Sequence, residues 1–327
     1  MRISVLGSGA WGTALAALLA KNKHKVTLRF LTRPHAEVVP VSGESRCLSG
    51  VRLPDSLELQ DGLEGVSDAE MVVLAPPSYA MRWNAEQLRG VIADDTVIVS
   101  ASKGIEISSG LRLTQVIEDV LGNSGRIAVL SGPSHAEEVA RGVPTGCVSA
   151  STELATARLT QDAFMCSDFR VYTSTDVIGA ELCGALKNVI AIAVGISDGC
   201  GYGDNTKAML MTRGLAEVSR LGERLGGNRE TFSGLAGVGD LIVTCTSQHS
   251  RNRRAGLNIG NGMSVQEAMD AVGAVVEGYY AAAAAVELAK RFSVEMPIAT
   301  ELHKVLYDGK NPKIATAHLM EREKKGE

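Results

Sequence analysis

Three glycines near the N-terminus have the spacing of a phosphate-binding turn. Gly7, Gly9 and Gly12 directly follow the apolar run Arg2–Leu6 and open a predicted apolar helix over residues 10–21. In this pattern the first glycine permits a tight turn, the second lets backbone reach a pyrophosphate, and the third lets helix and strand pack closely. The free N–H groups of the helix would face the phosphates. The spacing therefore favours a dinucleotide site over a purely structural glycine-rich turn.

Lys187 lies in the middle of a long apolar stretch, residues 177–196, in which the only other polar side chains are Glu181 and Asn188. Its neighbours three, four and seven residues away are all apolar or small: Ala180, Cys183, Gly184, Ile190, Ala191 and Val194. Burial disfavours the charged form of a lysine, and this would suit Lys187 to proton exchange near neutral pH. The alternative is a buried structural ion pair with Asp240 or Glu181.

Reduction of a ketone also needs carbonyl polarisation and a grip on the rest of the substrate. Lys103 follows the strand-like run 96–101, and the turn 131–134 follows the run 126–130. Ligands of open α/β sheets bind at the carboxyl ends of parallel strands, where both segments would lie. The stretch 250–253, Ser-Arg-Asn-Arg, offers a guanidinium fork with hydroxyl and amide donors for a phosphate. Each segment alone is typical of a surface loop, but together they favour a phosphorylated substrate.

The end of the second predicted strand, residues 25–31, usually reports on the ribose of a dinucleotide. A carboxylate there favours NAD, whereas an arginine accommodates the 2′-phosphate of NADP. This chain has Arg29 and Arg33, and no carboxylate before Glu37. The two arginines would project from one face of a straight strand, so NADPH is predicted to be preferred over NADH. The alternative is that both arginines are solvated surface residues.

Short apolar runs alternate with helical segments in the first half of the chain. The strand-like runs are rich in Val and Ile: 2–6, 25–31, 71–75, 96–101, 126–130, 146–150 and 169–172. Helices are predicted at 10–21 and 114–121, and then at 177–196, 206–225, 265–272, 277–291 and 298–307, with loops at 197–205 and 226–253. This order predicts an α/β fold. A Rossmann-like, doubly wound parallel sheet occupies residues 1–176, and an all-helical domain follows at 177–327.

Composition excludes several classes of function. The net charge of −4, without a basic stripe, argues against a nucleic-acid partner. The six cysteines contain no C-x-x-C pair and the six histidines are dispersed, so no metal site is expected and the thiols suit a reducing cytoplasm. A lysine at the centre of a membrane-spanning helix costs roughly 2.5–3.5 kcal/mol. No membrane span is therefore expected at 177–196.

The sequence resembles the bacterial NAD(P)-dependent glycerol-3-phosphate dehydrogenases over nearly its whole length. The resemblance is carried by GSGAWGTALA (7–16), SASKGIE (100–106), LSGPSHAEEVARGVPT (130–145), GALKNVIAIAVGISDG (184–199), NTKAMLMTRGL (205–215), TFSGLAGVGDLIVTC (231–245), SRNRRAG (250–256) and VVEG (275–278). It implies interconversion of sn-glycerol 3-phosphate and dihydroxyacetone phosphate with NAD or NADP. It also implies a supply of glycerol 3-phosphate for phospholipid synthesis, and a possible homodimer.

The resemblance also assigns roles to matching positions. Lys187 resembles the group that accepts the proton in glycerol 3-phosphate oxidation and donates it in reverse. The substrate contacts would be Lys103, Gly132, Ser134, Lys187, Asp240, Ser250, Arg251 and Asn252, with Thr244 a possible addition one turn after Asp240. The cofactor contacts would be Ala10, Trp11, Lys103, Ala136, Arg251, Val275 and Glu277, beside Gly7, Gly9, Gly12 and Arg33.

One region departs from the family pattern. The second strand is lengthened to VTLRFLTR, and an Asn-rich stretch before a Leu-Pro pair is replaced by residues 45–54, SRCLSGVRLP. Related enzymes, such as a 3-hydroxyacid dehydrogenase or a ketopantoate reductase, would not be expected to carry both Gly-Asp-Leu at 239–241 and Ser-Arg-Asn at 250–252. A nicotinamide-sensing regulator without turnover is a further alternative. Such a sensor has no need of Lys187, Lys103 and Asp240 together.

Overall fold

The computed structural model describes residues 1–32, 45, 47–122, 126–324 and 326. The chain divides into two compact units. Unit 1 consists of Met1–Glu106 with Leu111–Glu181, and unit 2 of Leu182–Glu327 with Ile107–Gly110. Arg33, one of the predicted cofactor contacts, lies outside the described residues.

Unit 1 is built on a sheet of eight strands in the order β3-β2-β1-β4-β5-β6-β7-β8. The strands are β1 (Arg2–Leu6), β2 (Lys25–Phe30), β3 (Leu57–Asp61), β4 (Met71–Leu74), β5 (Val97–Ser100), β6 (Ile127–Ser131), β7 (Thr145–Ala150) and β8 (Phe169–Ser174). The first six have the order of the doubly wound dinucleotide-binding sheet, which reverses between β1 and β4. The predicted fold class is confirmed.

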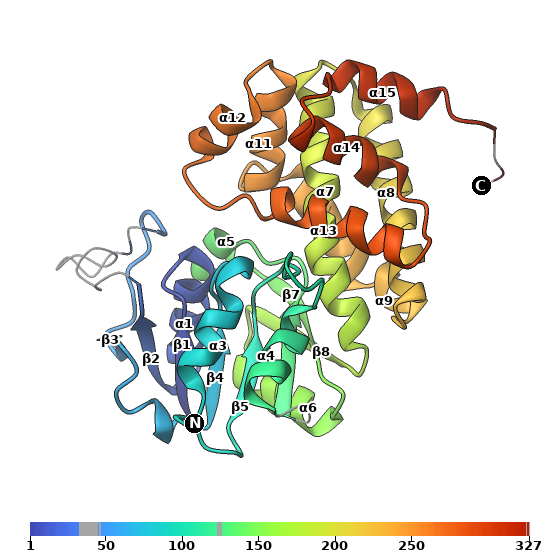
Figure 1. Ribbon diagram of the computed structural model, residues 1–327. Coiled ribbons are helices and arrows are strands. Elements are labelled where there is room, and N and C mark those ends of the chain that lie inside the picture. The colour runs from blue at the N-terminus through green and yellow to red at the C-terminus, as the bar shows by residue number, and fades with distance from the viewer. Residues whose placement is uncertain (33–44, 46, 123–125, 325, 327) are drawn as a thin grey trace. The chain divides into compact units, whose positions relative to one another are not determined.

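Both faces of this sheet are covered by helices, as Figure 1 shows for unit 1. In β4, Met71 and Val73 join one apolar cluster, whereas Val72 and Leu74 join the other. The first cluster also contains residues of α1 (Ala10–Lys21), α5 (Ala136–Ala140) and α6 (Leu154–Phe164), and the second contains residues of α3 (Met81–Leu88) and α4 (Leu113–Leu121). Successive strand residues point to opposite faces, so a doubly covered strand must be apolar throughout.

Three predictions for unit 1 need correction. The sheet is not wholly parallel, because β7 runs antiparallel to β6 while β8 runs parallel to β7. The strand β3 was missed, since its sequence LELQD is half polar and only its first residue is buried. Helices α3, α5 and α6 were also missed. They are short, with 8, 5 and 11 residues.

The described residues of unit 2 form helices joined by loops, with no strand among them. Its helices are α7 (Val177–Gly199), α8 (Asp204–Arg224), α9 (Arg229–Ser233), a π-helical turn (Leu235–Gly239), α10 (Asp240–Thr246), α11 (Arg251–Gly260), α12 (Val265–Val272), α13 (Glu277–Arg291), α14 (Pro297–Tyr307) and α15 (Pro312–Met320), and α7 begins within unit 1. The predicted loop at 226–253 is therefore wrong. Its glycines and short helical turns gave no clear periodicity.

α7 is long and apolar enough to cross a membrane by composition alone. In the folded chain, however, 89% of its most apolar 18-residue window is buried. The core helix of a soluble protein has the same length and composition.

α7 and α11 touch backbone to backbone. A Cβ atom added to Gly195 would lie 2.1 Å from the carbonyl oxygen of Arg253, and one added to Gly256 would lie 2.2 Å from that of Ile192. Gly199 and Gly260 meet the facing helix at 2.4 and 2.3 Å in the same way. Residue numbers rise together along the contact, so the two helices run parallel.

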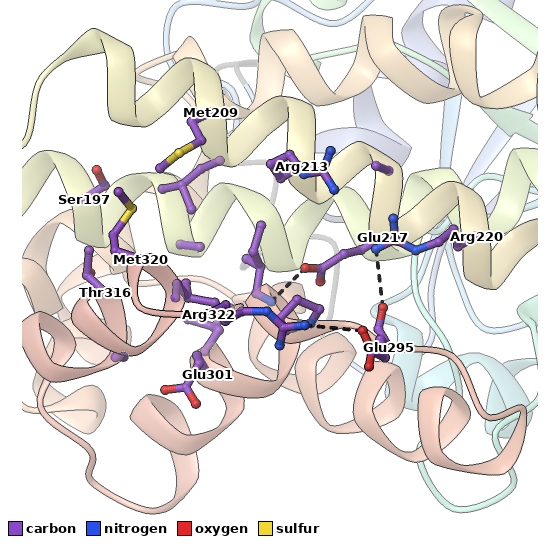
Figure 2. Close-up of a pocket in the computed structure, with 18 of the residues that line it drawn as sticks. Ser197, Met209, Arg213, Glu217, Arg220, Glu295, Glu301, Thr316, Met320 and Arg322 are labelled. Atoms are coloured by element: carbon purple, nitrogen blue, oxygen red, sulfur yellow. Dashed lines mark hydrogen bonds and ion pairs between the residues drawn. The ribbon is translucent and has the colours of Figure 1, made fainter. Parts of the chain in front are cut away.

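A buried carboxylate closes the N-terminus of α14. Glu217 of α8 (labelled in Figure 2) is 2% exposed. It accepts hydrogen bonds from the N–H groups of Ile298 (2.8 Å) and Ala299 (3.2 Å). Burial raises the pKa of this carboxyl to about 7, although the two N–H groups, Arg220 and Arg322 oppose the shift. Glu217 thus acts as an N-cap supplied by another helix.

The pKa of Glu217 predicts a pH-dependent stability. Its folded value of about 7 exceeds the ordinary 4.5, so its favourable contribution is full below pH 4.5 and is lost as the pH rises through 7. Glu217→Gln cannot titrate. The stability of the unchanged chain relative to this variant should fall by at most about 3 kcal/mol between these limits. Thermal unfolding of both proteins at pH 5, 6, 7 and 8 measures this, and parallel curves would contradict it.

Candidate functional site

The glycine-rich turn lies at the carboxyl end of β1. Gly7 has a φ of +117°, and a Cβ added to it would lie 2.6 Å from the carbonyl carbon of Ala75. A Cβ on Gly12 would lie 1.9 Å from the carbonyl oxygen of Gly7. Gly9, the N-cap of α1, has open space around it and no side-chain cap. The turn is thus tightly packed at Gly7 and Gly12 and open at Gly9. Ala10 and Trp11 are the first two residues of the helix that follows it.

Further predicted residues follow β5 and β6 at the same edge of the sheet. Lys103 donates through Nζ to the carbonyl oxygen of Gly132 (2.8 Å) and to Oγ of Ser134 (3.4 Å). Gly132 has a φ of +135°, and a Cβ on it would crowd Cys147 at 3.0 Å. Trp11 donates through Nε1 to the carbonyl oxygen of Ala101 (2.8 Å) and so joins the glycine-rich turn to the end of β5. Unit 1 therefore brings its predicted contacts to one edge.

Ala136 is the first residue of α5 and is buried. It follows the Gly132–Ser134 turn in the chain, at the same edge of the sheet.

Arg29 is not available to a cofactor phosphate. Its side chain is 3% exposed and donates to Oγ of Ser4 (3.1 Å) and to the carbonyl oxygens of Gly62 (3.3 Å) and Glu64 (2.8 Å). Burial lowers the pKa of this guanidinium. Arg29 holds the chain after β3 against β2, so the sequence prediction of an arginine phosphate contact now depends on Arg33 alone.

In unit 2, Lys187 meets two other predicted residues. Its ammonium forms an ion pair with Asp240 and donates to Oγ1 of Thr244 (2.6 Å). The Thr244 hydroxyl donates in turn to the carbonyl oxygen of Asp240 (2.6 Å). All three side chains are buried, with Lys187 8% exposed. Of the two ion-pair partners considered for Lys187, the structure selects Asp240. Glu181 instead binds Arg112 and Thr114.

The ion pair changes the expected electrostatics of Lys187. Burial alone disfavours an ammonium group, whereas a buried carboxylate in contact favours it. A charged lysine is a hydrogen-bond donor that can polarise a carbonyl oxygen.

Asp240 follows directly on the π-helical turn Leu235–Gly239. In this turn the N–H of Gly239 donates to the carbonyl oxygen of Gly234 (3.2 Å), and Gly237 packs so close to Phe232 that a Cβ would lie 2.0 Å from its carbonyl oxygen. π-turns are rare and occur often at functional sites. Here the turn sets the rotation at which α10 presents Asp240 to Lys187.

The segment 250–253 forms the N-terminus of α11. Ser250 is the N-cap and accepts from the N–H of Arg253 (3.2 Å). Asn252 donates to Oδ1 of Asn188 (2.9 Å) and accepts from the N–H of Gly278 (2.8 Å). The residue after Lys187 is therefore joined to α11 and to the start of α13, where Val275 and Glu277 lie.

Arg251 and Arg253 have different environments. Arg251 is exposed, and its guanidinium has no recorded bond to another described residue. Arg253, which belonged to the predicted phosphate-binding stretch, instead places two nitrogens on Oδ2 of Asp198, at 3.0 and 2.6 Å. Asn188, Gly278 and Asp198 were not singled out from sequence. No local pattern marks them, because their partners are distant in the chain.

Comparison with known proteins identifies the family. A family model described as NAD-dependent glycerol-3-phosphate dehydrogenase N-terminus matches residues 2–157. A second model, described as NAD-dependent glycerol-3-phosphate dehydrogenase C-terminus, matches residues 176–317. The chain belongs to the NAD-dependent glycerol-3-phosphate dehydrogenase family. The resemblance inferred from the sequence motifs is thereby confirmed.

Relatives align over almost the full length of this family member. Glycerol-3-phosphate dehydrogenase [NAD(P)+] of Moorella thermoacetica is 52% identical over 98% of the chain and 96% of its own length. The enzyme of that name from Thermoanaerobacter sp. (strain X514) is 48% identical over 100% and 99%. The crystal structure of glycerol-3-phosphate dehydrogenase from Coxiella burnetii has a TM-score of 0.92 at 38% identity, over 98% of this chain and 99% of that one.

A pair of glycine variants tests the dinucleotide turn of this dehydrogenase family member. Gly9→Ala adds its methyl group to open space at an ordinary φ of −73°, so the thermal midpoint should stay within about 2 °C. The methyl group would occupy the approach to the pyrophosphate, and NADPH affinity should fall at least about ten-fold, or 1.4 kcal/mol. Calorimetric titration measures this.

Gly7→Ala is the contrasting variant. Its φ of +117° and the contact with Ala75 should lower the thermal midpoint itself. Unchanged NADPH affinity in Gly9→Ala would remove this turn from the cofactor site.

Proposed function

We propose that the chain interconverts sn-glycerol 3-phosphate and dihydroxyacetone phosphate with NAD(P)+/NAD(P)H. The observation that carries this proposal is the buried Lys187 ammonium held by Asp240 and Thr244, in a family whose listed relatives bear that enzyme's name. A ketone reductase needs a proton donor at the carbonyl oxygen, and a buried ammonium held by a carboxylate suits that role.

Lys187 serves as the general acid and base. In reduction its ammonium donates a hydrogen bond to the carbonyl oxygen and passes a proton to it as the alkoxide forms. Asp240 keeps the lysine charged before this step and orients it, while Thr244 fixes a second ammonium hydrogen. In oxidation the neutral amine accepts the hydroxyl proton of glycerol 3-phosphate.

The substrate phosphate binds at the N-terminus of α11. That terminus offers main-chain N–H groups and the positive end of a ten-residue helix. Arg251 is exposed there, and a guanidinium matches phosphate oxygens through a planar fork. Because Asn252 is bonded to Asn188, this terminus lies level with Lys187 on the parallel helix α7. The family resemblance adds Ser250, Asn252, Lys103, Gly132 and Ser134 to the proposed substrate contacts.

The dinucleotide is held by the glycine-rich turn of unit 1. Gly7, Gly9 and Gly12 shape the turn, Ala10 and Trp11 start the helix, and the open space above Gly9 fits a pyrophosphate. When bound, the nicotinamide supplies or accepts the hydride. We propose that both cofactors are used, that NADPH is preferred through Arg33, and that the remaining contacts are Lys103, Ala136, Arg251, Val275 and Glu277.

We further propose that the enzyme works in the cytoplasm and supplies glycerol 3-phosphate for phospholipid synthesis. The spacing of the six cysteines, which contains no C-x-x-C pair, supports the cytoplasmic location.

A lysine substitution tests the proposed mechanism. Lys187→Met removes the general acid, so kcat for dihydroxyacetone phosphate reduction should fall roughly 10²- to 10⁴-fold, while NADPH affinity stays within a few-fold. Absorbance of the reduced nicotinamide, followed with NADPH and with NADH, gives both rates.

Lys304→Met is the matched control, because Lys304 also pairs with a carboxylate of unit 2, Glu301, at 2.8 Å. It should retain activity. Near-normal turnover by Lys187→Met would reject the proposed role, and no turnover by the unchanged chain would favour a nicotinamide sensor.

The family resemblance also leads us to propose a homodimer, and one surface of unit 2 suits it. A groove of about 1300 Å³ runs between α7, α8, α14 and α15 (Figure 2). It contains none of the predicted site residues. Of the twenty-eight described residues that line it, four are arginines and none is a lysine. Interfaces usually contribute about 20–30 residues a side and are enriched in Arg and Met but depleted in Lys and Glu. The groove follows this pattern in its arginines and its lack of lysine, but it is also lined by five glutamates.

The charges of this groove suit a second copy of the chain. Arg213 and Arg224 form no salt bridge with another described residue, and Glu323, which also lines the groove, is exposed. A two-fold interface uses the same patch on both partners, so a patch with both signs of charge can pair with itself. The exposed Met209 (40%) and Met320 (64%) add apolar contact area.

Met209→Glu should convert the dimer to a monomer, because it places a carboxylate in the apolar part of the paired patches. Light scattering coupled to gel filtration measures the mass. Met263→Glu is the control, because Met263 is similarly exposed (46%) but does not line the groove. A monomeric unchanged chain, or an equal effect of both variants, would reject this surface.

A further inference from the structure

Asp198 lies near the end of α7 and binds two cations of unit 2. Its Oδ2 accepts from Nε and Nη2 of Arg253, at 3.0 and 2.6 Å, and its Oδ1 lies 3.2 Å from Nζ of Lys207. The side chains of Asp198 and Arg253 are only 12% and 17% exposed. A pair that is this shielded and uses two nitrogens is held more firmly than a surface ion pair.

Arg253 belongs to the first turn of α11, two residues after Arg251. The turn is therefore attached to α7 at two places. Asn252 is bonded to Asn188, next to Lys187, and Arg253 is bonded to Asp198 further along α7. One attachment would leave α11 free to slide or rotate about it, whereas two attachments along the axis fix both motions.

The glycine contacts between α7 and α11 cannot supply this constraint alone. They let the two backbones touch, at 2.1 Å for a Cβ on Gly195 and 2.2 Å for one on Gly256. Contacts between glycines and main chain determine how closely α7 and α11 approach each other. They provide few side chains that would oppose a shift of α11 along the axis of α7. The polar attachments at the N-terminal turn of α11 supply that opposition.

We propose that Asp198 and Arg253 are positioning residues that fix the distance between the phosphate anchor on α11 and the proton-transfer group Lys187 on α7. This inference rests on the proposed function, because it needs Arg251 to bind the substrate phosphate. The pair touches neither substrate nor cofactor. It acts by matching the spacing of the two groups to a three-carbon phosphate.

The spacing matters because a phosphorylated ketone must engage both groups at once. A displacement of about 1 Å at a reacting group can cost roughly a hundred-fold in rate. Dihydroxyacetone has the same carbonyl group but no phosphate. It can therefore reach Lys187 whatever the position of α11, and it separates positioning from general stability.

Asp198→Asn tests the proposal. It keeps the size of the side chain but removes the charge that holds Arg253, so kcat/KM for dihydroxyacetone phosphate should fall roughly ten- to a hundred-fold. The value for dihydroxyacetone should change less than about three-fold. Arg253→Lys keeps a positive charge and loses the two-nitrogen contact, and it should show a smaller change in the same direction.

Lys310→Met is the control, because it breaks the ion pair with the buried Glu301 elsewhere in unit 2. It should lower the thermal midpoint without changing the ratio of the two substrates. Equal losses on both substrates in Asp198→Asn, or an unchanged ratio, would overturn the positioning role. An unchanged chain that does not prefer the phosphorylated ketone would instead reject the proposed function.

Discussion

The burial of one positive charge constrains much of unit 2. Lys187 lies in the apolar helix α7, and an unpaired ammonium there would cost several kcal/mol. Asp240 and Thr244 compensate for this charge. Their position depends in turn on the π-helical turn Leu235–Gly239, which requires Gly237 against Phe232. A single residue with the potential for acid–base chemistry thus accounts for an irregular turn fifty residues away in the chain.

Unit 1 meets a different constraint, because the phosphate site that we propose for it is made of backbone and needs space instead of charge. Gly7 and Gly12 are pressed against neighbouring backbone, whereas Gly9 faces open space. The side chains nearby serve the scaffold: Trp11 binds the end of β5, and Lys103 binds the turn after β6. These two hydrogen bonds join three of the segments that follow the carboxyl ends of the strands.

Periodicity and glycine spacing predicted the parts of this fold that are set locally. Strands that are buried on both faces were predicted from their unbroken runs of Val and Ile. Helices α1 and α13 were predicted with the same bounds as in the structure. Helices α3, α5 and α6 were missed, and so was strand β3, in which three of five residues are polar. Length alone does not explain the missed helices, because α4, α12 and α14 are similarly short and were predicted. The direction of β7 also escaped, because hydrophobicity does not encode strand direction.

In the candidate site, too, local features could be predicted from the sequence, whereas contacts between distant residues could not. The sequence indicated that Lys187 is buried, but it left both Asp240 and Glu181 as possible ion-pair partners. Only the fold determines which of the two carboxylates contacts the lysine. The sequence left Arg29 as the second of two arginines that could reach a ribose phosphate, after Arg33. In the structure the carbonyl oxygens of Gly62 and Glu64, in the chain after β3, bind the Arg29 guanidinium instead. The sequence treated Arg253 as part of a phosphate-binding stretch, although Asp198 lies fifty-five residues away and leaves no local trace.

The contact between α7 and α11 has a consequence for how this sequence can diverge. At Gly195, Gly199, Gly256 and Gly260, any side chain would overlap main-chain atoms of the facing helix, at 2.1–2.4 Å. Main chain cannot be replaced by a smaller residue, so no compensating substitution exists across the contact. Where two side chains pack against each other in the core, a larger residue at one position can be compensated by a smaller residue at the other. These four positions cannot be compensated in this way, and descendants of this gene can vary around them only while each codon still specifies glycine.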